Sequence, residues 1–133
     1  MADAELAPWL RLTLIDGIGG ESQRSLLKAF GLPEAIFAAS PATLEQAVGG
    51  VISRRLLAAA VEAEARALAA AISAALDWAQ QAGNAILTLA DPAYPQALLE
   101  CADPPTLLYV KGHVELLNRP MLAMVGSRNA TAQ

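Results

Sequence analysis

The sequence changes its pattern at Gly83, and this change limits the possible folds more than any other feature. Before Gly83, apolar residues recur at helical spacing between Gly and Pro breakers. After it, short runs rich in leucine and β-branched residues alternate with proline-containing turns, a pattern typical of strands. We therefore predict an α+β fragment, with an all-α domain over residues 1–82 and a second, strand-containing domain over residues 83–133.

The helical part is predicted to be several short helices followed by one long helix. Ser40-Pro41 is expected to start or cap the last short helix. Ser53 is expected to cap the long helix, in which Glu62, Glu64 and Arg66 form the solvent-exposed face. The predicted helices cover residues 6–15, 21–30, 34–39, 43–48 and 54–81.

The second part is predicted to contain three strands and one short helix. The strands are expected over residues 85–89, 106–110 and 121–125, and the helix over residues 96–100. The third strand is uniformly apolar, as a strand buried on both faces of a sheet would be.

Charge and cysteine content narrow the classes of function. The net charge is −4, and neither part is basic, so any contact with nucleic acid has to depend on a few well-placed groups. The single Cys101 has no His or Cys near it at metal-ligand spacing, so we predict neither a metal nor a cofactor. The longest uncharged helical run, residues 67–76, is shorter than the roughly 20 residues that span a bilayer. We expect a cytoplasmic protein without membrane insertion.

The most informative segment is the apolar run that ends in Gly126-Ser127-Arg128. A buried strand that leads into such a turn presents backbone amides at its carboxyl end, where a phosphate group binds well. Gly126 allows close approach to the backbone, Ser127 offers a hydroxyl, and Arg128 can hold phosphate with two hydrogen bonds. The alternative is an ordinary turn with a solvated arginine.

Two common nucleotide-binding motifs are absent from this segment. A dinucleotide fingerprint would need glycines at positions 128 and 131, where Arg128 and Thr131 stand. The phosphate-binding loop of the Walker type is not found anywhere in the chain. NAD and ATP are therefore disfavoured as ligands.

A series of motifs in the second part resembles the entry to the DprA/Smf (DNA-processing) family domain. The matching residues, in order, are Tyr94-Pro95, Leu98, Asp103-Pro104-Pro105, Leu108-Tyr109, Lys111-Gly112 and Met124-Val125-Gly126-Ser127-Arg128-Asn129-Ala130-Thr131. The resemblance implies a sterile-alpha-motif-like helical domain followed by the beginning of a Rossmann-like domain, which continues in the family well beyond this loop.

The resemblance also implies a function. Proteins of this family bind single-stranded DNA in natural transformation, protect it, help load the RecA recombinase, form homodimers and are not enzymes. The DNA-contacting role carries over to Gly126, Ser127 and Arg128, with Asn129 and Lys111 as further candidates. For Lys111, a structural or simply solvated role is the alternative.

A second candidate for phosphate contact is the loop at residues 16–20, which resembles a helix-hairpin-helix element. Arg24 and Lys28, one turn apart on the following helix, could support such a contact. Asp16 and Glu21 flank the loop and would repel phosphate, so a purely structural hairpin is the favoured interpretation.

The remaining polar and aromatic residues are expected to be structural or solvated. His113 is interpreted as a solvated histidine and Cys101 as an unreactive thiol. Trp9 and Trp78 are interpreted as core or interdomain anchors rather than base-stacking residues.

Two other functions stay open from the sequence. One is a fragment of a nucleotide-binding Rossmann-like enzyme, whose catalytic residues would have to lie beyond the visible segment. The other is a helical protein-interaction module formed by residues 1–82.

Overall fold

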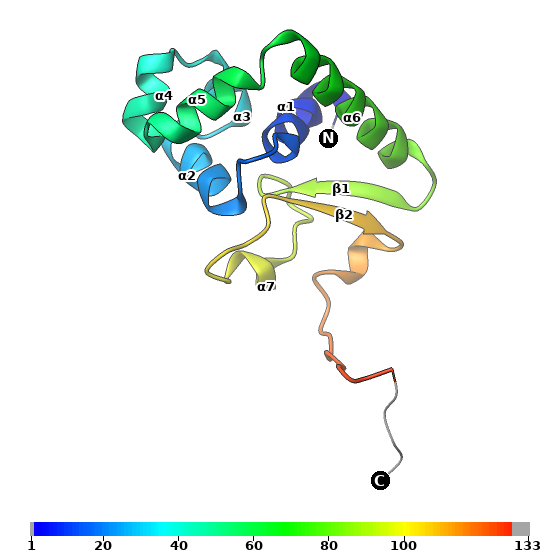
Figure 1. The fold of residues 1–133 in the computed structure, drawn as a ribbon. Coiled ribbons are helices and arrows are strands. Elements are labelled where there is room, and N and C mark those ends of the chain that lie inside the picture. The colour runs from blue at the N-terminus through cyan, green and yellow to red at the C-terminus, as the bar shows by residue number, and fades with distance from the viewer. Residues whose placement is uncertain (1, 129–133) are drawn as a thin grey trace.

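The computed structural model describes residues 2–128, in which helices precede one small sheet. The elements follow in the order α1 (Asp3–Leu14), α2 (Gly20–Phe30), α3 (Pro33–Ala38), α4 (Pro41–Val48), α5 (Gly50–Ala58), α6 (Glu62–Gln80), β1 (Asn84–Thr88), α7 (Gln96–Leu99), β2 (Leu107–Lys111) and the 3₁₀ turn η1 (Val114–Leu116). Figure 1 shows the strands lying beside α1 and the end of α6. The predicted α+β composition is confirmed.

The four predicted short helices are present, and three of them carry Gly, Ser or Pro at their ends. Gly31 ends α2 with a positive φ of 86°, and its N–H donates to the Leu27 carbonyl at 2.7 Å. Ser40 caps α4 by accepting a hydrogen bond from the Thr43 N–H at 3.2 Å. Pro33 stands in the first turn of α3, where the missing N–H costs nothing.

The prediction of one long helix over residues 54–81 is wrong. The chain forms α5 and α6 with a turn at residues 59–61 between them, and Ser53 lies inside α5 rather than at a cap. The Ser53 hydroxyl donates to the Pro41 carbonyl at 3.4 Å, which ties α5 to the start of α4. The turn lets α5 pack on α4 and α6 pack on α1, so both helices bury an apolar face.

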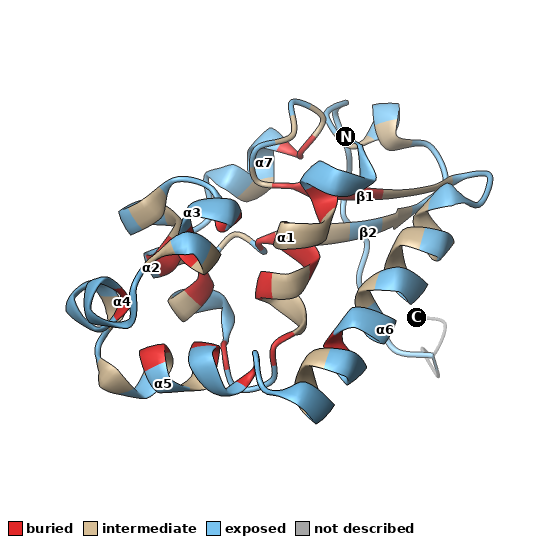
Figure 2. Ribbon diagram, turned by 90° about the horizontal axis from the view of Figure 1, so that it is seen from above, coloured by how far each residue is buried: buried red, intermediate tan, exposed pale blue. Residues whose placement is uncertain are grey.

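A first hydrophobic cluster holds the short helices together. It gathers buried side chains from α1, the loop after it, and each of the other helices up to α6. Its buried members are Leu12, Ile15, Ile18, Leu26, Ile36, Leu44, Leu56, Ala59 and Leu68. Figure 2 shows these buried segments facing inward around α1.

A second cluster joins the helices to the sheet. Leu6, Trp9 and Leu10 of α1 pack with Ile86 of β1. Half-buried residues of α6 and β2 surround them. This cluster contains side chains from before and after residue 83. The predicted division into two domains at residue 83 therefore stays a prediction.

The sheet has two antiparallel strands in the part of the chain that the structure describes. The register pairs Asn84 with Lys111 and Ile86 with Tyr109. Both strands lie within one residue of their predicted positions, and the predicted short helix is α7. The pairing of these strands is antiparallel, so the Rossmann-like arrangement of parallel strands also stays a prediction.

The predicted third, buried strand over residues 121–125 is wrong for this structure. These residues form no strand and are exposed, from 69% at Met121 to 99% at Val125. Figure 1 shows the chain after η1 running away from the helices and the sheet. Strand conformation is stable only with a hydrogen-bonded neighbour, and within residues 2–128 neither β1 nor β2 pairs with this segment.

Candidate nucleic-acid interface

The Gly126-Ser127-Arg128 segment lies at the end of the described chain and is exposed throughout. A Cβ atom placed on Gly126 would meet no atom within 4 Å, so nothing in the described chain covers this side of the backbone. Arg128 forms no ion pair with any residue of the described range 2–128. Arg128 is exposed. Asn129 lies outside the described residues.

Lys111 is the last residue of β2, and its side chain is exposed. The opposite residue is Asn84, whose side-chain amide donates to the Trp78 carbonyl at 2.9 Å and so fixes this end of the sheet to α6. Within residues 2–128, Lys111 takes part in neither of the ion pairs. The structure does not bring Lys111 into contact with residues 126–128.

The connection between the two strands is held by buried polar contacts. Tyr94 is fully buried, and its hydroxyl donates to the Pro105 carbonyl at 2.6 Å. Burial raises the pKa of Tyr94, so the phenol keeps the proton that this hydrogen bond needs.

Asn118, just after η1, fixes the same loop from the other side. Its side-chain oxygen accepts from the Gln96 N–H at 2.8 Å, and its amide donates to the Ala93 carbonyl at 3.2 Å. These bonds set the point at which residues 119–128 leave the body of the molecule.

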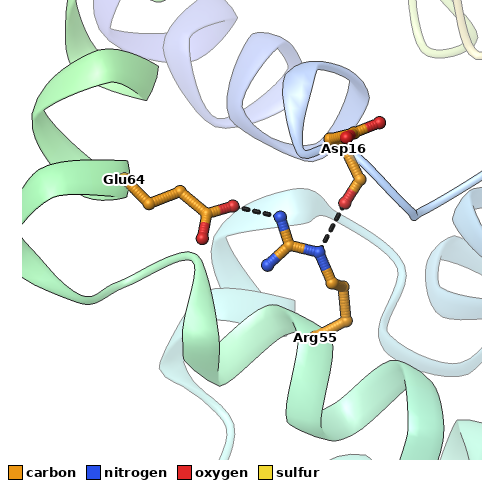
Figure 3. Close-up of polar contacts among 3 residues, drawn as sticks. All are labelled: Asp16, Arg55 and Glu64. Carbon is orange, nitrogen blue, oxygen red and sulfur yellow. Dashed lines mark hydrogen bonds and ion pairs between the residues drawn. The ribbon is translucent and has the colours of Figure 1, made fainter.

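The hairpin at residues 15–19 is closed and supported from several sides. Gln23 donates to the Ile18 carbonyl at 2.9 Å, and the Ile18 side chain is buried in the first cluster. Arg55 of α5 donates through Nε to the Asp16 carbonyl at 2.6 Å (Figure 3). Gly17 has a φ of 87°, a conformation that favours glycine, and a Cβ there would lie 3.2 Å from Arg55 Nε, a tight contact.

Arg55 also forms an ion pair with Glu64 of α6, across the turn between α5 and α6 (Figure 3). The hydrogen bond from the guanidinium lowers the pKa of Glu64, and the same bond raises the pKa of Arg55. The Glu64 side chain keeps 42% exposure, as the predicted solvent-exposed face requires, but its ion pair with Arg55 was not predicted. The partner is nine residues away on a helix whose separate existence the sequence did not indicate, so no spacing rule could have found this pair.

Arg24 and Lys28, the two cations that could support phosphate binding at the hairpin, differ in their contacts. Arg24 donates to the Pro104 carbonyl at 3.4 Å, which connects α2 with the loop before β2. Lys28 is exposed near the end of α2. The Arg24 bond and the Arg55 contact support the structural interpretation of the hairpin.

The other candidates have simple environments. His113 is exposed, and its Nδ1 lies 3.3 Å from Glu115 Oε1, so it forms an ion pair when protonated. Cys101 is exposed, and its thiol contacts the Ala97 carbonyl at 3.6 Å. Among residues 2–128, no three His, Cys, Asp or Glu side chains gather closely enough to hold a metal ion. The same part of the chain contains no helix with the length and apolar character needed to cross a membrane.

Comparison with known proteins places the family resemblance in the C-terminal part of the chain. The family model described as DNA recombination-mediator protein A matches residues 85–133. This range includes β1 except Asn84, all of β2 with Lys111, and the Gly126-Ser127-Arg128 segment. No curated protein and no solved structure matches the chain.

Proposed function

Residues 85–133 belong to the family of DNA recombination-mediator protein A, and on that premise we propose that this protein acts in DNA recombination by binding single-stranded DNA. The contact is assigned to Gly126, Ser127 and Arg128, with Lys111 and Asn129 as further phosphate contacts. The observation that carries the proposal is the family match over the segment that contains these residues. The open position of the Arg128 side chain supports it.

The chemistry of the segment suits a DNA backbone. An exposed guanidinium can hold a phosphate with two parallel N–H···O bonds, and Gly126 has no side chain to keep the strand away. Because the chain carries a net charge of −4, there is no general attraction for a polyanion. Binding should therefore depend on few cations, and each should matter measurably.

The first test replaces Arg128 by Ala and measures binding of a labelled oligothymidine by fluorescence anisotropy at several salt concentrations. Loss of one phosphate contact should weaken binding and reduce the slope of log affinity against log salt by about 1. The matched control is Arg66→Ala, which removes the same charge from an exposed position on α6. Equal effects of the two substitutions, or no binding by the unaltered protein, would overturn the proposal.

Further parts of the proposal rest on the family resemblance alone. We propose that the protein assists RecA loading, forms a homodimer, works in the cytoplasm and is not an enzyme. Co-sedimentation with RecA filaments, sedimentation equilibrium and a nucleotide-hydrolysis assay test the RecA, dimer and enzyme statements in turn. Turnover of a nucleotide would favour the Rossmann-like enzyme alternative.

A further inference from the structure

A pair of aromatic rings lies on the surface where the end of α6 meets β2. The ring centroids of Trp78 and Tyr109 are 5.6 Å apart, and the ring planes make an angle of 70°. Rings in this edge-to-face arrangement attract each other. Tyr109 is 52% exposed, and Trp78 is half-buried.

The exposure of this pair contrasts with the other residues of the same types. The chain has two tryptophans and two tyrosines. Trp9 is 4% exposed in the second cluster, and Tyr94 is fully buried with its hydroxyl hydrogen-bonded. Trp9 and Tyr94 are buried for packing and hydrogen bonding. Packing in the core does not account for a tyrosine ring that is 52% exposed, as Tyr109 is.

The pair is held rigidly. Trp78 packs against the second cluster, and its carbonyl accepts hydrogen bonds from the Asn84 side chain and the Gln81 N–H. Tyr109 is fixed in β2 opposite Ile86, which is buried in the same cluster. A ring that is already fixed loses little conformational entropy when a ligand stacks on it.

A cation stands beside the rings. Lys111 follows Tyr109 by two residues in the strand, so the two side chains lie on the same face, about 6.6 Å apart along the strand. Partial burial raises the pKa of Tyr109, so its phenol stays neutral beside a phosphate. Asp77, next to Trp78, is exposed and acidic, so a phosphate is expected on the Lys111 side.

We propose that Trp78 and Tyr109 form a stacking platform for an unpaired base, and that Lys111 contacts the phosphate of the same nucleotide. Aromatic rings beside a cation are the chemistry that single-stranded nucleic acid requires, because every base offers a π-face. This inference rests on the proposed function and adds a second contact to it, separate from residues 126–128. It replaces the expectation that Trp78 serves only as an anchor.

The test uses the fluorescence of the protein itself. Trp9 is buried, so a base that stacks on the platform should quench mainly Trp78. Titration with oligothymidine should quench the unaltered protein, and Trp78→Phe, which leaves Trp9 alone, should abolish the quenching. Tyr109→Ala should weaken binding on the order of tenfold, whereas Tyr109→Phe, which keeps the ring, should bind as the unaltered protein does.

Salt dependence separates the platform from the phosphate contacts. Stacking releases no counterions, so Tyr109→Ala should lower the affinity without changing the salt slope, while Lys111→Ala should reduce the slope by about 1. Circular dichroism of each variant shows whether it is folded. The quenching measurement on the unaltered protein does not depend on any variant.

The outcomes distinguish the two proposals. If oligothymidine binds and Arg128→Ala weakens it, but Trp78 is not quenched and Tyr109→Ala has no effect, the platform is wrong and the proposed function stands. If the unaltered protein binds no oligothymidine, both are wrong. Equal quenching by oligouridine would extend the platform to RNA, since stacking on a base does not involve the sugar.

Discussion

Arg55 shows how one side chain can fix three segments. Its guanidinium donates to the Asp16 carbonyl in the hairpin and pairs with Glu64 on α6. Arg55 therefore joins α5 to the hairpin at residues 15–19 and, across the turn at residues 59–61, to α6. Sequence analysis identified the hairpin but not its support, because a contact between residues 39 positions apart leaves no periodic pattern.

The Arg55–Glu64 pair predicts a pH dependence of stability. The folded-state pKa of Glu64 is lowered, so the unfolded chain binds more protons in acid. The stabilisation is present above the ordinary pKa of Glu, and it is lost as the pH falls through the lower folded value. Glu64→Gln should therefore lose less stability on acidification than the unaltered protein does, as measured by urea unfolding at neutral and acidic pH.

The control for that experiment is Glu62→Gln, two residues away on α6, where the carboxylate forms no ion pair within residues 2–128. Glu62→Gln should keep the acid-induced loss of the unaltered protein. If both variants show the same pH dependence, the pair does not contribute to stability in solution.

The boundaries of individual helices are set by local capping residues where such residues are present. Ser40 and Gly31 lie at the ends of helices close to the bounds predicted for them, 43–48 and 21–30. The turn between α5 and α6 contains Ala59, Ala60 and Val61, none of which is a helix breaker. It forms because Ala59 is buried there, at 1% exposure, while the two helices pack on different neighbours.

Capping by Ser40 gives a prediction for α4. Ser40→Ala removes the acceptor of the Thr43 N–H and should lower the free energy of unfolding by about 0.5–2 kcal/mol. Ser40→Asp, which keeps an acceptor, should restore most of this loss. Ser73→Ala, the same change at an exposed position inside α6, is the control and should have little effect in denaturant unfolding.

The whole molecule is unified by the second cluster, in which α1, α6 and both strands share apolar contacts. Ile86 of β1 packs on Leu6, Trp9 and Leu10. The helices and the β1–β2 sheet should therefore unfold together. The described residues after η1, 117–128, take no part in either cluster.

Ile86→Ala tests this cooperativity. Removal of a side chain that is 6% exposed should cost about 2–5 kcal/mol. Helix content by circular dichroism and amide exchange of β1 should shift to the same extent. Val125→Ala, at 99% exposure, should change stability by less than about 0.5 kcal/mol. An unchanged helix transition with lost protection in β1 would show that the two parts unfold independently.

The sequence by itself determined the short helices, the strands β1 and β2, and the family resemblance of residues 85–133, because caps, breakers and motif order are local properties of the chain. It also supplied the candidate residues from Lys111 to Asn129. Only the tertiary structure decided the split of the long helix, the Arg55–Glu64 pair, the meeting of Trp78 with Tyr109 and the exposed state of residues 121–125. Each of these features depends on which residue, distant in the sequence, a segment contacts. Such contacts are set by packing and hydrogen bonding across the whole molecule and not by local sequence.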